Sequence, residues 1–297
     1  SLKFKVILFG FIFTFFSSFG QSYFLGLFNS SIREALSITH GQFGSIYASA
    51  TLCSSLLLIW VGKKIDDVNI FKFAFFVTIL LSFACFFFSR VTSVFLLFIA
   101  IFLMRFSGQG MMSHTASTTI SRYFTKTRGR ALSISWFGLS SAEFIMPVLM
   151  VYLLTIIDWQ NLWLIFSISV LIILPIVSFL LIKNLNLDSR EANDENIKHV
   201  EIKQWRRRDV LKDYRFYIIS SNMLAMPWIF TGFAVFQSFV QTSKGWGPYV
   251  IAQSFMSYSI FSVLTLFLSG FLIDKFTSRK LLIYMNIPLL LSVIVLF

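Results

Sequence analysis

Long apolar stretches separated by short polar steps run along almost the whole chain. A membrane-spanning helix needs about 20 consecutive apolar residues, and nine stretches approach or reach this length. They lie near residues 5–28, 43–61, 70–88, 94–117, 131–156, 161–182, 214–241, 249–272 and 281–297. Runs such as FAFFVTILLSFACFFF lack the period-two alternation of a transmembrane β-barrel. The pattern therefore predicts an all-α membrane protein that crosses the bilayer about nine times.

Composition agrees with a protein whose main partner is the lipid bilayer. Hydrophobic residues make up 57% of the chain and charged residues 13%, with a mean hydropathy of +0.79. Soluble domains carry about 25% charged residues. The 38 Phe residues would make an insoluble surface unless most of them faced lipid. The composition therefore excludes an ordinary water-soluble domain.

The distribution of Lys and Arg predicts the orientation in the membrane. The loops on one side, starting with Lys3 and Lys5, carry 21 of these residues, whereas the other side has only Arg33, Arg90 and Lys244. Cytoplasmic loops are enriched in positive charge, so we expect a cytoplasmic N-terminus. The net charge of +12 is thus explained by topology, and no nucleic-acid partner is predicted.

One long hydrophilic stretch divides the chain. Residues 184–213 separate six predicted spans in residues 1–183 from three in residues 214–297. We interpret this stretch as a cytoplasmic linker between two bundles. Because the chain has no initiator Met and stops within an apolar run, we expect a fragment.

Two charged connections between spans, called the charged steps below, have the same arrangement of a Gly followed four residues later by an Asp. WVGKKIDDVNIFK contains Gly62 and, four residues later, Asp66; LSGFLIDKFTSRKLL contains Gly270 and Asp274. The two glycines are 208 residues apart. Because the same arrangement occurs at matching points of a six-span unit, it is a more specific signal of an internal repeat than either charged step alone.

Six spans, a linker and a second set with the same charged step resemble the major facilitator superfamily over the whole chain. RFSGQG (105–110) is similar to the signature of its fourth helix, and RYFTKTRGRALSI (122–134) to its basic loop before helix five. The resemblance implies two pseudo-symmetric six-helix halves related by an axis along the membrane normal, of which about nine helices are present here. It also implies a secondary transporter that moves a small molecule by alternating access.

The two charged steps are candidate gating elements. Gly62 and Gly270 allow close helix approach, and each Asp can cap a helix or pair with basic residues. By the superfamily's symmetry, Asp274 should approach the start of helix five, near Arg130, in an outward-facing state. The partner of Asp66 would then lie on a helix eleven. The alternative is that these loops only carry charge that sets the topology.

Arg105 and Glu143 are the two charged residues deep inside predicted spans. Each lies eleven or twelve residues into its helix, which at 1.5 Å per residue reaches roughly the bilayer midplane. Charges there are costly and indicate function by default. One interpretation is an ion pair that only stabilises the bundle. In the other, Arg105 binds a carboxylate substrate through its planar fork and Glu143, shielded from water, carries a proton.

Neighbouring polar positions complete the candidate site. Gln109 lies on the helix face of Arg105 and Trp136 on that of Glu143, while Gln21 is a polar residue within the first span. We expect interhelical hydrogen bonds from the other uncharged polar residues in spans, which include Asn222, Gln237, Gln253 and Tyr258. Pro227 predicts a kink in the seventh helix.

These features favour a transporter in a bacterial inner (plasma) membrane; the oligomeric state cannot be read from the sequence, and our expectation is a monomer. Its expected cargo is an organic anion, similar to a monocarboxylate, taken up by symport with protons. The alternatives are a proton-coupled multidrug exporter and a non-transporting membrane sensor. No hydrolase, kinase or metal motif is present, and Cys53 and Cys85 fall in apolar segments without ligand spacing. We therefore expect no enzymatic activity, no cofactor and no metal site.

Overall fold

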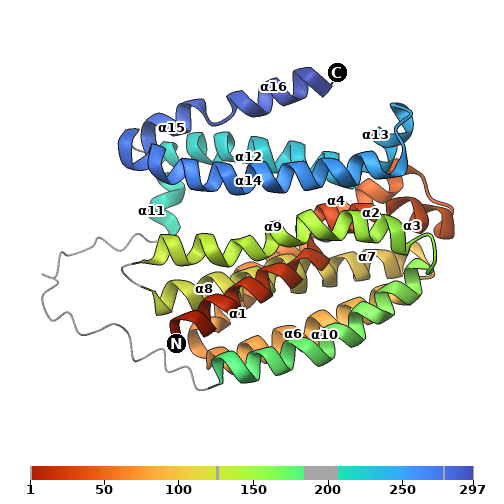
Figure 1. Cartoon of the computed structure of the whole chain (residues 1–297), viewed down its shortest axis with the longest axis horizontal. Helices are drawn as coiled ribbons and strands as arrows, with labels where there is room; N and C mark the ends of the chain where they lie inside the picture. The colour runs from red at the N-terminus through yellow and green to blue at the C-terminus, as the bar shows by residue number, and fades with distance from the viewer. Residues whose placement is uncertain (1, 125–126, 184–206, 277, 297) are drawn as a thin grey trace, which may run out of the picture. The chain divides into compact units, whose positions relative to one another are not determined.

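The computed structural model describes residues 2–124, 127–183, 207–276 and 278–296, and these ranges are helical apart from short connections (Figure 1). Eight helical segments in the described ranges are long and apolar enough to cross a membrane. They are Leu2–Gly20, His40–Asp67, Ile70–Ser89, Val94–Tyr123, Arg128–Leu153, Trp159–Ile182, Tyr214–Val235 and Pro248–Leu268. A shorter apolar segment, Lys280–Leu296, follows. The all-α membrane class is thus confirmed.

Several spans begin where a side chain caps the first turn. The side chain of Thr39 accepts from the Gln42 amide, and the Gln42 side chain accepts from the Thr39 amide, which together form a capping box before α4 (His40–Val61). Asn69 caps α6 (Ile70–Ser89) and Ser93 caps α7 (Val94–Met104). These caps satisfy amides that the helix itself leaves unpaired.

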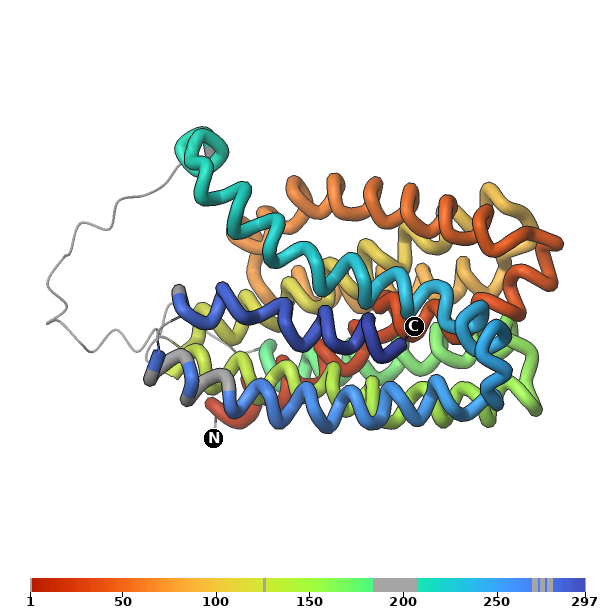
Figure 2. The backbone as a smooth tube through the Cα atoms, turned by 90° about the horizontal axis from the view of Figure 1, so that it is seen from above, coloured from red at the N-terminus to blue at the C-terminus, as the bar shows by residue number. Residues whose placement is uncertain are grey.

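The contacts divide the structure into two units. The first comprises Ser1–Glu191 with Ala234–Val263, and the second comprises Ala192–Phe233 with Leu264–Phe297. In the first unit α1 (Leu2–Ser17) packs along α9 (Arg128–Leu153), and α6 packs along α10 (Trp159–Ile182). Figures 1 and 2 show these long helices lying lengthwise beside one another.

An aromatic cluster fills part of the core of the first unit. Trp163 of α10 is fully buried, and its ring lies within 6.1 Å, centroid to centroid, of five phenylalanine rings. These belong to Phe19, Phe24, Phe28, Phe88 and Phe166. Burial of such large rings contributes strongly to packing, so the first span is anchored to α6 and α10 at this level.

The first predicted span is not one helix. After α1 come a 3-10 turn η1 (Ser18–Gly20), the extended residue Gln21, and two short helices, α2 (Ser22–Leu27) and α3 (Asn29–Leu36). The only local signal for this interruption in the apolar run from 5 to 28 is the polar segment SSFGQS at residues 17–22. Across from it, the fourth span contains a π-helical segment, η2 (Arg105–Met112), between α7 and α8 (Ser113–Tyr123).

The seventh and ninth spans are interrupted as well, whereas the eighth is not. The seventh span runs without interruption through Pro227 as α12 (Tyr214–Val235), breaks at Phe236 and resumes as α13 (Gln237–Ser243). The eighth is the single helix α14 (Pro248–Phe276). The ninth is divided into α15 (Ser278–Tyr284) and α16 (Ile287–Leu296). Short helices α5 (Lys64–Asp67) and α11 (Arg207–Lys212) lie in connections.

Helix α9 contains two glycines with opposite surroundings, which gives a test of the α1–α9 packing. A Cβ at Gly138 would meet the carbonyl oxygen of Phe11, whereas nothing lies within 4 Å of a Cβ at Gly129. The Thr14 hydroxyl also donates to the Ser135 carbonyl of α9 at 2.6 Å. The close approach of α1 therefore depends on the missing side chain at Gly138.

We predict that Gly138→Ala lowers the free energy of unfolding by about 1–3 kcal/mol through this clash. Gly129→Ala should leave it unchanged or raise it by up to about 1 kcal/mol, because alanine favours helix. Thermal melting of both variants in detergent micelles measures the difference. Equal melting temperatures for the two variants would contradict the packing of α1 on α9.

Candidate functional site

The interruption of the first span and the π segment of the fourth meet backbone to backbone. A Cβ at Gly20 would overlap the Met104 carbonyl and the Gln109 amide, and a Cβ at Gly108 would meet the Gly20 amide at 2.6 Å. Glycine is therefore required at both positions for this approach. Discontinuous helices form the binding sites of many transporters, and π segments are frequent at functional sites.

Arg105 lies at this meeting point and is only 6% exposed. Its Nη1 donates to the Gly20 carbonyl at 2.9 Å and to Ser22 Oγ at 3.2 Å. The guanidinium carbon lies 5.3 Å from the ring centroid of Tyr47, whose hydroxyl donates to Ser22 Oγ at 2.9 Å. Arg105 Nε is buried and finds no hydrogen-bond partner among the described residues. Arg105 thus binds a carbonyl freed by the helix break and keeps one buried donor unused.

Glu143 is only 7% exposed within α9 and is not paired with Arg105. In the described part of the chain no ion pair joins the two side chains, so the purely structural ion pair is not formed in this conformation. The carboxyl lies within electrostatic range of Tyr23 and of Tyr258. Pro147, one turn further along α9, cannot donate to the Glu143 carbonyl.

Two of the other predicted lining residues, Gln21 and Gln109, lie at the same interruption, whereas Trp136 lies on α9. Gln21 is the extended residue between η1 and α2 and is half-buried. Gln109 lies in the π segment and Trp136 on α9, both half-buried. The structure thus places Arg105, Gln21 and Gln109 at one locus, with Glu143 and Trp136 on the helix that packs along α1.

The first charged step is held by the fourth span. Arg122 of α8 forms an ion pair with Asp66 and donates to the Ile65 carbonyl at 3.2 Å. His114 Nε2 lies 2.8 Å from the Gly62 carbonyl oxygen. These partners were not predicted, although His114 and Arg122 lie two turns apart on the same side of α8. In this conformation Asp66 pairs within the first unit.

The ion pair between Asp66 and Arg122 is largely solvated, with side-chain exposures of 67% and 30%. Such pairs contribute little to stability. It is therefore suited to breaking and reforming at low cost.

The second charged step is only partly described. Gly270 and Asp274 lie in α14, but their side-chain surroundings fall outside the described residues. Arg130, the expected neighbour of Asp274, is exposed in the first turn of α9. The approach of Asp274 to Arg130 remains a prediction.

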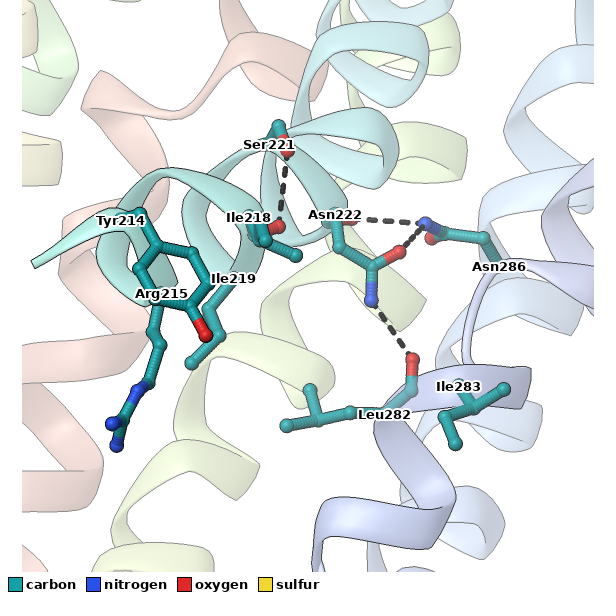
Figure 3. A pocket seen from close by; sticks show the side chains of 9 residues that line it. All are labelled: Tyr214, Arg215, Ile218, Ile219, Ser221, Asn222, Leu282, Ile283 and Asn286. Atoms are coloured by element: carbon teal, nitrogen blue, oxygen red, sulfur yellow. Dashed lines mark hydrogen bonds between the residues drawn. The ribbon is translucent and has the colours of Figure 1, made fainter.

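The second unit has a hollow of about 1120 Å³ between α12 and the junction of α15 with α16 (Figure 3). It is lined by Tyr214, Arg215, Ile218, Ile219, Ser221, Asn222, Leu282, Ile283 and Asn286. Asn222 Nδ2 donates to the Leu282 carbonyl at 2.8 Å, and Asn286 Nδ2 donates to Asn222 Oδ1 at 2.6 Å. The interhelical hydrogen bonding predicted for Asn222 is confirmed. Because the two amides bind each other, the hollow is a weaker candidate than the Arg105 locus.

No metal centre is evident in the part of the chain that the structure describes. In these residues no group of three or more His, Cys, Asp or Glu side chains comes together at a possible metal site.

Comparison with known proteins agrees with these features. The family model of the Major Facilitator Superfamily matches residues 10–297. A search of curated proteins found no match. Among solved structures, the chain is similar to a bacterial homologue of the human lysosomal transporter Spinster in an inward-facing, unoccupied conformation. The TM-score is 0.69 with 19% identity, over 94% of this chain and 64% of that one, so the chain spans less than two thirds of that protein.

Tyr47→Phe tests the polar cluster around Arg105. The variant keeps the ring beside the guanidinium but removes the donor to Ser22 Oγ, and should lower the free energy of unfolding by about 0.5–1.5 kcal/mol. Tyr47→Leu, which also removes the ring, should cost more. Tyr152→Phe, at an exposed position of α9, is the matched control. If Tyr47→Phe and Tyr152→Phe melt alike in detergent, the Tyr47–Ser22 bond is not formed.

Proposed function

The chain belongs to the Major Facilitator Superfamily, and on that premise we propose that it acts in a secondary transporter that carries a small organic anion together with protons. The observation that carries the proposal is the presence of two buried charges that form no ion pair with each other, Arg105 at the start of η2 and Glu143 within α9. Arg105 and Glu143 are each less than a tenth exposed and do not neutralise each other. A buried charge without a counter-charge is costly, so the retention of both is best explained by ligands that bind and leave.

Arg105 supports an anionic cargo. Its guanidinium group presents donors in a planar fork that matches a carboxylate. One donor, Nε, is buried without a partner, and Nη1 is held by a backbone carbonyl and a hydroxyl. An entering carboxylate would replace neutral acceptors with a charged one. This exchange strengthens the hydrogen bonds of Arg105 without moving it.

Glu143 supports proton coupling. A carboxyl removed from water is less stable in its charged form, and no described ion pair stabilises its charge. A substrate anion nearby would further favour the protonated form. Anion and proton would then bind together, which is the sign required for symport.

A second candidate is a proton-coupled exporter of cations. It is favoured by one observation, namely that Arg105 already binds the Gly20 carbonyl while Glu143 lacks a counter-ion. An acidic group of this kind could recognise a cationic substrate and exchange it for protons. The two candidates differ in the effect of protons on substrate binding: protons promote binding of the anion in the symporter but compete with the cation in the exporter.

The charge distribution supports one orientation. We propose that the N-terminus is cytoplasmic in a bacterial inner membrane, because the loops on that side carry 21 Lys and Arg against 3 on the other.

Glu143→Gln separates substrate binding from proton coupling. A permanently neutral side chain carries no proton, so the full-length variant in vesicles should retain counterflow exchange of carboxylates but lose accumulation driven by a pH gradient. Glu34→Gln, at an exposed position of α3, is the matched control and should lose neither. Equal loss of counterflow and accumulation, or loss of neither, would reject the coupling role.

Arg105→Lys tests the anion site. A point charge cannot reproduce the bidentate fork, so the apparent affinity for a carboxylate should fall by about tenfold or more, in line with the strength of a charge-assisted bond. Arg90→Lys, which alters an exposed arginine after α6, should leave it unchanged. Competition uptake with a panel of carboxylates and cations measures this. Unchanged carboxylate affinity with altered cation recognition would favour the exporter.

A further inference from the structure

The first and seventh spans change direction at equivalent positions. The 208-residue offset that relates Gly62 to Gly270 also relates Phe28 to Phe236. Phe28 separates α2 from α3 with φ −93° and ψ −1°, and Phe236 precedes α13 with φ −99° and ψ 18°. The same short break in the backbone is therefore repeated in both spans.

The residue after each break is an amide that reaches across to the other span. Asn29 Nδ2 donates to the Val235 carbonyl at 2.8 Å, and Gln237 Nε2 donates to the Tyr23 carbonyl at 2.9 Å. Asn29 and Gln237 are themselves 208 residues apart. Both are almost completely buried, at 0% and 3% exposure. Each span thus donates one hydrogen bond from an amide side chain to a backbone carbonyl of the other, and the two donors occupy equivalent positions of the internal repeat.

The two spans touch between these amides. Gly26 lies directly against the Ala234 carbonyl, where a Cβ would not fit, and Gly26 and Ala234 are again 208 residues apart. Helix α13 contacts α2 at the end of the first unit to which both belong (Figure 1). Contact between equivalent residues is expected where an internal two-fold axis passes.

The carbonyl that receives the bond from Asn29 is available because of the break in the seventh span. The last carbonyls of a helix have no partner within it, and Val235 ends α12. A buried carbonyl without a partner is unfavourable, but water can take the place of the amides if the spans separate. The contact can therefore open and close without permanent loss of hydrogen bonds.

We propose that Asn29 and Gln237 form an amide clasp that closes the transport path at the end of the bundle opposite the N-terminus. In the orientation proposed above, this is the outer side of the membrane. The inference rests on the proposed transport function. The clasp is formed while the path is closed to the outside, and it must separate for each outward-facing state.

Cysteine labelling of the full-length transporter tests the clasp. In a background without native cysteines, Gln21→Cys places a reporter seven residues before Phe28, on the inner side of the clasp. Right-side-out vesicles are treated with a membrane-impermeant maleimide. Asn29→Ala and Gln237→Ala should each raise the labelling rate about fivefold, and the double variant about twentyfold or more, as expected for loss of one or two net hydrogen bonds. Ser30→Ala, an exposed neighbour of Asn29, should have no effect.

Folded variants that label at the original rate would overturn the proposal, even if their melting temperature falls. Equal acceleration by Ser30→Ala would also overturn it. If the alanine variants do not fold, Asn29→Asp and Gln237→Glu keep the side-chain size, lose the amide donors and carry the same expectation. Failure of these to fold would overturn the clasp as well, because a contact that opens in every cycle cannot be indispensable for folding.

The labelling measurement requires neither substrate nor a proton gradient. A failure of the clasp therefore leaves the Arg105 and Glu143 experiments intact, and a failure of proton coupling leaves the labelling result intact.

Discussion

Hydrocarbon offers no hydrogen bonds, so every backbone group freed within a membrane span must find a partner inside the protein. This constraint organises the polar chemistry of the structure. The break in the first span is satisfied by Arg105 at the Gly20 carbonyl. The break in the seventh is satisfied by Asn29 at the Val235 carbonyl, and the junction in the ninth by Asn222 at the Leu282 carbonyl. Arg105, Asn29 and Asn222 therefore bind carbonyls where helices are interrupted, and interruptions are where a transporter can bind and bend.

The same constraint separates the two buried charges. Because Arg105 is held by a backbone carbonyl and by Ser22, it is not available to neutralise Glu143 in this conformation. Glu143 is instead surrounded by the packed helices of the first unit, near the tyrosines at positions 23 and 258. An ion pair between Arg105 and Glu143 would have neutralised both charges in this conformation. Two separate sites leave each charge free to respond to its own ligand, which is the physical basis of the proposed coupling.

Much of the fold could be predicted from the sequence, whereas the partners of its polar residues could not. Hydrophobic length alone locates the spans, and the charged steps reveal the internal repeat. Because Arg105 and Glu143 lie at equal depth in the membrane, the sequence suggested that they meet. Depth alone, however, does not determine toward which neighbouring helix each side chain points. The break at Phe236 had no local signal, since Pro227 lies within the continuous part of α12. The partner of Asp66 was missed because Arg122 was interpreted only as loop charge. In each case the local sequence allows several side-chain or backbone conformations, and tertiary packing determines which one is adopted.

The internal repeat separates what the two sets of spans share from what they do not. Three positions of the first span have counterparts of similar character in the seventh. The small residue Gly26 corresponds to Ala234, the aromatic Phe28 to Phe236, and the amide Asn29 to Gln237. Ser22 and Tyr47, which hold Arg105, correspond instead to Phe230 and Phe255. The elements that bring the spans together are thus symmetric, while the polar cluster around Arg105 has an apolar counterpart. A symmetric closure needs equivalent contacts from both sides, but a small substrate needs only one set of donors. This difference is a physical reason to assign the first group to gating and the second to recognition.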